Sequence, residues 1–121
     1  MPKFIRSLSF ACSGIVLAVR SQRHMKIHAI AAVIVCIIGA MLPLTRLEWA
    51  VLLLTMALVI SLEMVNTAIE KTVDLASPDI HPLAKAAKDV AAGAVLVSAC
   101  MAVIIGLLIL GPPLWHFIVN E

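Results

Sequence analysis

Three carboxylates recur at helical spacing in the segment EMVNTAIEKTVD, residues 63–74. Glu63, Glu70 and Asp74 are separated by seven and four residues, so at about 100° per residue they fall within about 20° of one line on a helix. Asn66 and Thr67 flank that line. Carboxylates arranged in this way bind cations, take up protons or pair with lysines. This acidic face is therefore the first candidate for chemistry.

The residues before Glu63 place the acidic face in a membrane. The segment WAVLLLTMALVISL, residues 49–62, carries no charge. Acids inside a transmembrane helix are costly, so they face a protein interior or a wet cavity and mark a functional site. At about 1.5 Å per residue Glu63 lies about 21 Å from Trp49, within a hydrocarbon layer about 30 Å thick. Glu70 and Asp74 then reach the headgroup level, and we expect Glu63 and Glu70, about 10 Å apart, to have different tasks.

The composition is that of an integral membrane protein with a single domain, residues 1–121. The chain is 63% hydrophobic and only 13% charged, far from the average of soluble proteins. Its net charge of +2 does not indicate nucleic-acid binding, because basic and aromatic residues are not interleaved on a polar surface. The start of the chain is not expected to be cleaved as a signal peptide, because its apolar patch is short and Ser9 stands where a lipoprotein-type site needs a large aliphatic residue.

The hydrophobic pattern predicts an all-α membrane protein with an N-terminal amphipathic surface helix and three transmembrane helices. The surface helix covers about residues 2–26 and has basic residues at its edges. The predicted spans cover about residues 28–44, 49–75 and 83–110. The connector at residues 45–48 is so short that the first two spans must be antiparallel. The third helix is expected to stop at Gly111-Pro112-Pro113.

The basic residues predict the orientation of these spans. If the N-terminus and residues 71–88 lie on one side, that side holds eight of the nine Lys and Arg residues, with only Arg46 opposite. By the positive-inside rule this side is cytoplasmic, and the C-terminus is then outside.

Lys85, Lys88 and Asp89 open the third span at the level of Glu70. Carboxylates for a divalent cation, lysines for phosphate and a deeper carboxylate form a set suited to phosphoryl transfer, although no Gly-rich phosphate loop is present. A small proton- or ion-conducting oligomer would use the same ingredients. In a purely structural interpretation, Asp74 and Asp89 pair with nearby lysines, and the small residues of the third span form a packing stripe: Ala84, Ala87, Ala91, Ala94 and Ser98.

EMVNTAIEKTVD, followed by HPLAKAAKDVAAGAVLV, closely resembles the small prokaryotic diacylglycerol kinase family, most of all its undecaprenol kinase branch. The resemblance extends from about Lys3 to Leu110 without an evident insertion. It implies a homotrimer in the bacterial cytoplasmic (inner) membrane that uses Mg²⁺ and ATP to phosphorylate a membrane lipid alcohol. The acceptor is undecaprenol, or alternatively diacylglycerol, since the aliphatic composition does not separate the two.

The resemblance also implies roles for individual residues. Glu63 is the general base at the lipid hydroxyl and contacts the lipid together with Ala92. Glu70 holds the magnesium, with Asn66 and Asp74 in support. The residues implied at the nucleotide are Lys3, Phe10, Gln22, Glu70, Asp79, His81, Lys88 and Asp89.

The chain departs from the family pattern at position 22. The family commonly has a second metal-binding glutamate there, and this chain has Gln22. An amide oxygen coordinates a cation but contributes no charge. The departure puts the metal affinity in question while leaving Glu70, Lys88 and Asp89 intact.

Overall fold

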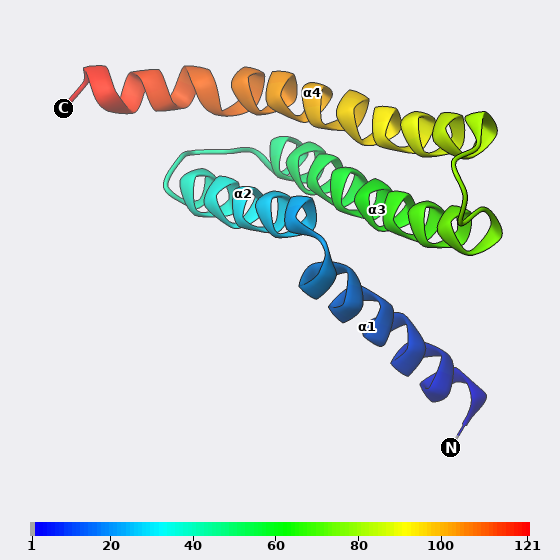
Figure 1. Ribbon diagram of the computed structural model, residues 1–121. Helices are drawn as coiled ribbons and strands as arrows, with labels where there is room; N and C mark the ends of the chain where they lie inside the picture. The colour runs from blue at the N-terminus through cyan, green and yellow to red at the C-terminus, as the bar shows by residue number, and fades with distance from the viewer. Residues whose placement is uncertain (1) are drawn as a thin grey trace.

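The computed structural model describes residues 2–121, and these residues form four α-helices and no strand (Figure 1). The helices are α1 (Lys3–Ser21), α2 (Arg23–Ala40), α3 (Arg46–Ala76) and α4 (Pro82–Val119). All four are long and apolar enough to cross a membrane. The prediction of an all-α membrane protein is confirmed.

Gln22 alone separates α1 from α2. Its backbone is extended, with φ −115° and ψ 120°, so the helix that the sequence predicts to run to about residue 26 ends at Ser21 and a new one begins at Arg23. From this break α1 diverges from the other helices (Figure 1), and Ala18 is its one buried residue. The Gln22 side chain does not cap α2. The Gln22 amide is therefore free to contact a ligand at the junction of the two helices.

The hairpin of α2 and α3 is antiparallel, as its short connector predicts. A capping box starts α3 at Arg46, three residues before the predicted start: the Thr45 hydroxyl accepts from the Glu48 N–H at 3.2 Å, and the Glu48 carboxylate accepts from the Thr45 N–H at 3.4 Å. Near the turn, Gly39 packs against Trp49. A Cβ atom at position 39 would lie 2.9 Å from the Trp49 ring, so glycine permits this close approach of the two helices.

The prediction that Gly111-Pro112-Pro113 stops the last helix is wrong, because α4 continues through both prolines to Val119. Each proline removes one N–H from the helical hydrogen-bond ladder, which costs about 3 kcal/mol in an ordinary helix interior. In an apolar environment an unwound backbone would leave more polar groups without partners, and transmembrane helices therefore tolerate proline. The apolar residues on both sides favour continuation.

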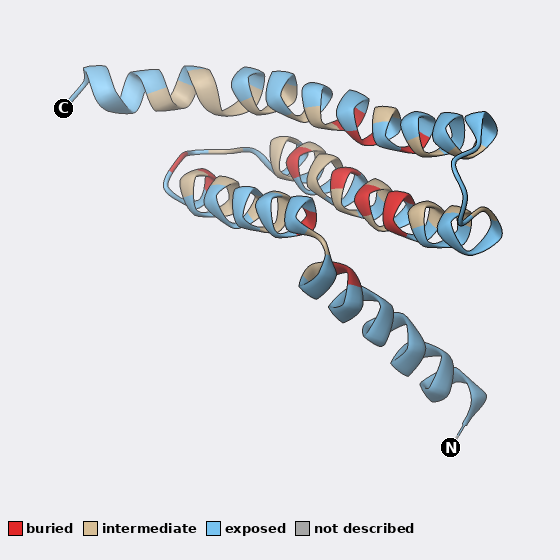
Figure 2. Ribbon diagram, in the orientation of Figure 1, coloured by how far each residue is buried: buried red, intermediate tan, exposed pale blue. Residues whose placement is uncertain are grey.

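The core lies mainly between α3 and α4, which pack along much of the length of α3 (Figure 2). Three of its members on α3 are polar: Glu63, Asn66 and Thr67. From α4 the buried residues are Ala91, Val95 and Ser98. The predicted stripe of small residues is therefore only partly correct, since Ala87 and Ala94 on the same helix are exposed. The bundle thus buries a polar patch at the acidic face of α3.

Candidate active site

A cavity of about 350 Å³ lies where the Gln22 junction, α2, α3 and α4 meet, and we call it the site cleft. Five of the predicted site residues line it: Gln22, Glu63, Asn66, Glu70 and Ala92. They come from three separate parts of the chain. The break at Gln22 and the packing of α4 on α3 bring them together.

Glu63 is the most deeply placed acid, with 4% of its side chain exposed. The Nε2 atom of the His28 side chain lies 3.8 Å from Glu63 Oε2. The backbone carbonyl of Glu63 also accepts a hydrogen bond of 3.0 Å from the Thr67 hydroxyl. A buried carboxylate with one loose contact retains lone pairs for a further partner. Such a group is suited to accept a proton from a bound hydroxyl.

Asn66 and Glu70 form a second pair, one turn further along α3. The Asn66 amide nitrogen donates to Glu70 Oε1 at 3.2 Å. Asn66 Oδ1 is buried and, among the described residues, accepts no hydrogen bond. A buried acceptor without a partner is costly, which is typical of a position that a ligand completes. The cleft can therefore accommodate a donor or a cation beside Glu70.

The side chains around Asn66 Oδ1 fit a hard cation held by oxygen. Glu70 supplies a carboxylate, and Asn66 and Gln22 supply amide oxygens, which are the ligand types that Mg²⁺ prefers. Across residues 2–121 no three His, Cys, Asp or Glu side chains converge into a metal cluster. Glu63 and Glu70 are the two carboxylates of the cleft, and Gln22 contributes an uncharged side chain at the junction of α1 and α2.

The remaining acidic and basic candidates line a different cavity, which we call the turn pocket. It has a volume of about 320 Å³ and surrounds the connection between α3 and α4. Five predicted site residues line it: Asp74, Asp79, His81, Lys88 and Asp89. The structure therefore divides the predicted residues between two neighbouring cavities.

Ion pairs and a helix cap organise the turn pocket. Lys88 of α4 pairs with Asp74 of α3, and Lys85 pairs with Asp89 along α4, as the structural interpretation of these acids expects. His81 Nδ1 accepts from the Leu83 N–H at 3.1 Å and so caps α4. The pairs are partly or fully exposed, so each stabilises the fold little. Their charges remain accessible from the solvent.

Two predicted residues lie in neither cavity. Lys3 and Phe10 are exposed on the part of α1 that diverges from the bundle (Figure 1), and neither lines the site cleft or the turn pocket. Their role at the nucleotide stays a prediction.

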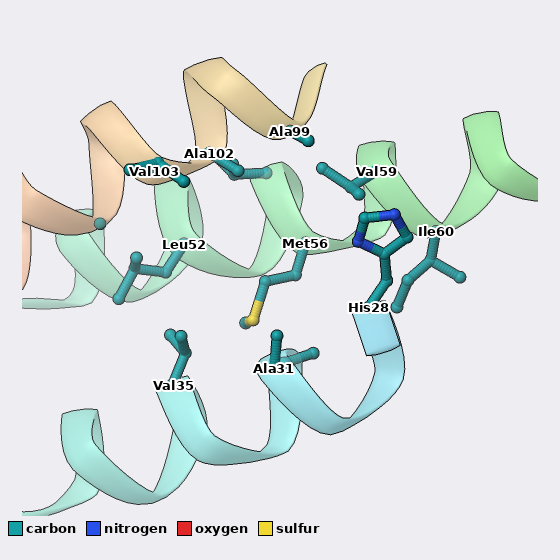
Figure 3. Close-up of a pocket in the computed structure, with 13 residues that line it drawn as sticks. His28, Ala31, Val35, Leu52, Met56, Val59, Ile60, Ala99, Ala102 and Val103 are labelled. Atoms are coloured by element: carbon teal, nitrogen blue, oxygen red, sulfur yellow. The ribbon is translucent and has the colours of Figure 1, made fainter. Parts of the chain in front are cut away.

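Sequence reasoning missed His28 and the apolar groove beside it. The groove has a volume of about 330 Å³ and lies between α2, α3 and α4 (Figure 3). His28 and Ala99 line both the groove and the site cleft, so the two cavities adjoin. No spacing along the chain relates His28 on α2 to Glu63 on α3. The one available signal was a polar residue at the start of an otherwise apolar run.

Comparison with known proteins identifies the family. Residues 9–110 match the family described as prokaryotic diacylglycerol kinase, which is most of the chain. The chain belongs to this family. The resemblance seen in its two motifs is confirmed. The site cleft, the apolar groove and the turn pocket all lie within the matched residues, whereas Lys3 precedes them.

Individual relatives are similar over 78% to 98% of the chain. The undecaprenol kinase of Bacillus subtilis strain 168 is 48% identical over 112 residues, covering 93% of this chain and 91% of that protein. The diacylglycerol kinase of Synechocystis is 44% identical over 119 residues, covering 98% and 68%. The diacylglycerol kinase of Helicobacter pylori strain J99 is 32% identical over 95 residues, covering 78% and 74%.

Proposed function

We propose that this chain transfers the γ-phosphate of ATP to the hydroxyl of undecaprenol, giving undecaprenyl phosphate and ADP. As a member of the prokaryotic diacylglycerol kinase family, the chain is a lipid kinase. One observation carries the proposal: a cleft with a buried carboxylate, Glu63, adjoins an apolar groove at His28 and Ala99. A long lipid alcohol needs both features, a polar site for its hydroxyl and an apolar path for its chain. The 48% identity to an undecaprenol kinase favours a polyprenol acceptor.

Glu63 acts as the general base in this proposal. The lipid oxygen attacks the γ-phosphorus while its proton passes to the Glu63 carboxylate, and ADP leaves with the electrons of the broken P–O bond. The position of Glu63 supports this role, because it is the acid that lies next to the apolar groove. Ala92 lines the same cleft and leaves room for the lipid head.

The nucleotide then lies between the site cleft and the turn pocket. Glu70 would hold Mg²⁺, with the amide oxygens of Asn66 and Gln22 nearby, and the ion would neutralise phosphate charge when bound. Lys88 and Asp89 contact the nucleotide, and Asp74 supports the site by orienting Lys88. Asp79 and His81 line the same pocket, with Lys3 and Phe10 of α1 as further contacts.

In the proposed membrane placement, α1 lies in the interface of the bacterial cytoplasmic membrane and α2, α3 and α4 span it. At about 1.5 Å per residue, the 31 residues of α3 extend about 46 Å, longer than the hydrocarbon thickness of about 30 Å. One end of α3 therefore projects to the headgroup level, where Glu70 and Asp74 meet a water-soluble nucleotide. The positive-inside rule makes this side cytoplasmic.

The direct test measures the transfer of labelled γ-phosphate from ATP to undecaprenol and to diacylglycerol side by side, in vesicles of the same composition. We expect phosphate transfer with undecaprenol as the preferred acceptor. A preference for diacylglycerol would make the chain a diacylglycerol kinase. No labelled lipid from either acceptor would refute the lipid kinase assignment.

The functional unit in this proposal is an oligomer, because one chain leaves the site cleft open on one side, and the family resemblance implies that the oligomer is a homotrimer. Glu70 is only half-buried in the single chain, and lipid contact at this polar surface would be costly. Mixing Glu63→Gln subunits with Lys88→Ala subunits tests whether sites are shared. We expect the mixture to regain part of the wild-type activity. Recovery of none, in a mixture that forms oligomers, would mean that each subunit is self-contained.

Gln22→Glu is expected to tighten magnesium binding about threefold to tenfold, because it adds a carboxylate beside Glu70. Without the ion, two facing carboxylates repel, so the same change lowers the melting temperature of the metal-free protein. Magnesium half-saturation and melting temperature with and without the ion check both effects. Ser21→Glu is the matched control, since it adds the same charge at an exposed position that does not line the cleft. If neither quantity responds to Gln22→Glu, position 22 lies outside the metal shell.

A further inference from the structure

His28 lies at the boundary between two cavities of opposite character. On one side is the apolar groove, whose other lining residues are almost all aliphatic; on the other is the site cleft with its carboxylates. Figure 3 shows His28 at one end of the groove, with its ring directed towards Val59 and Ile60 of α3. An imidazole at this boundary is placed where the hydroxyl of a lipid would lie if its chain occupied the groove.

His28 approaches only one of the two carboxylate oxygens of Glu63. His28 Nε2 lies 3.8 Å from Glu63 Oε2, and the two side chains are 21% and 4% exposed. This distance exceeds a hydrogen bond by about 0.6 Å or more, so the ring must move by that amount to donate to the carboxylate. The other titratable groups lining the cleft are His24 and Glu70. Among the described residues, the His28 ring is the basic side-chain group that lies near the Glu63 carboxylate across the helices.

We propose that His28 is a positioning residue for the kinase reaction: its Nε2–H holds Glu63 Oε2, so that Oε1 faces the hydroxyl of a lipid whose chain lies in the apolar groove. This inference rests on the proposed function. A neutral imidazole has one N–H donor, and donating it to one carboxylate oxygen leaves the lone pairs of the other free. The lipid O–H bond breaks as its proton passes to Oε1, the oxygen bonds to the γ-phosphorus, and ADP departs with the electron pair of the broken bond. The carboxylate then releases the proton to water.

The expected effect follows from the cost of misplacing a catalytic group. Loss of orientation by about 1 Å costs up to about 100-fold in rate. Removing the donor at position 28 should therefore lower kcat by about 10- to 100-fold. The KM for ATP should change far less than kcat, because His28 contacts Glu63 and is not among the residues assigned to the nucleotide. The KM for undecaprenol should change far less than kcat.

Two near-isosteric variants separate positioning from packing. His28→Gln keeps an N–H donor of similar reach, and His28→Met has similar length without a donor. We expect His28→Gln to retain most of the wild-type kcat and His28→Met to lose it, with both variants as oligomeric as wild type. His116→Met is the matched control, because His116 is exposed near the far end of α4. If His28→Met does not fold, His28→Leu replaces it in the same comparison.

Three results would overturn the inference. His28→Gln and His28→Met could lose kcat equally, both could keep the wild-type kcat, or only the KM for undecaprenol could move, which would make His28 a lipid contact alone.

A second readout is the double variant: in a Glu63→Gln background, His28→Met should cause no further loss of residual activity, since its effect acts through Glu63. The wild-type assay separates the two levels of failure. If the wild-type enzyme is active and substitutions of His28 leave kcat unchanged, only this inference is refuted. If the wild-type enzyme is inactive, the lipid kinase assignment is refuted.

Discussion

Replacing Glu63 by Gln is expected to abolish lipid phosphorylation, with a loss of about 10²- to 10⁴-fold in kcat. The amide has nearly the shape of the carboxylate, so the buried packing between α3 and α4 is kept, but it does not take up the proton of a hydroxyl. Nucleotide binding and oligomerisation should remain close to wild type, because the change preserves the shape of the side chain and leaves Glu70 and the turn pocket intact. Transfer of labelled phosphate to undecaprenol measures the loss, and titration with ATP measures the binding.

Glu48→Gln is the matched control for this change. Glu48 lies on the same helix, where it completes the capping box with Thr45, and glutamine serves in that box as glutamate does. The control should therefore keep both fold and activity. Full activity in a purified Glu63→Gln variant would remove Glu63 from the chemistry and leave its burial without a functional reason.

Replacing Glu70 by Gln should raise the magnesium concentration needed for half-maximal activity by at least about tenfold, which corresponds to about 1.4 kcal/mol. The change removes the carboxylate that is hydrogen-bonded to Asn66, and the amide oxygens of Asn66 and Gln22 carry no charge to replace it. Because a glutamine side chain at position 70 would still offer an oxygen to the Asn66 amide, the hydrogen bond between these positions can persist. Activity measured against magnesium at several fixed ATP concentrations gives the shift.

An unchanged magnesium dependence together with lost activity would give Glu70 a structural role through Asn66. Glu70→Asp provides a further comparison, since it keeps the charge and shortens the side chain by one methylene. We expect it to need less magnesium than Glu70→Gln. The reverse order would show that the contact with Asn66 matters more than the charge.

Much of the architecture followed from patterns within single segments. The apolar runs predicted the helices, the short connector predicted an antiparallel hairpin, and the spacing of Glu63, Glu70 and Asp74 predicted one acidic face. The two motifs pointed to the family that the whole-chain comparison confirms. These features depend on helical periodicity and on the transfer of apolar side chains from water into the membrane. Both are properties of a single segment of the chain.

Helix boundaries were less predictable, because they depend on backbone hydrogen bonds. Gln22 breaks the first helix although no proline or glycine stands there, and α4 continues through Pro112 and Pro113 although they stop most helices. At Pro112 and Pro113 the apolar flanking residues favour a continuous helix, and at Gln22 the extended backbone separates two helices. Local propensity is too weak to decide between the alternatives.

Only the tertiary structure decided which side chains share a cavity. It divided the candidate residues between the site cleft and the turn pocket, placed Gln22 in the same cleft as Glu70, and brought His28 of α2 within 3.8 Å of Glu63 on α3. The physical reason is that neighbours on one helix recur every three or four residues, whereas neighbours on different helices depend on crossing angle, rotation and depth. Those quantities arise from packing all the helices together, such as Gly39 against Trp49, and no single segment contains them.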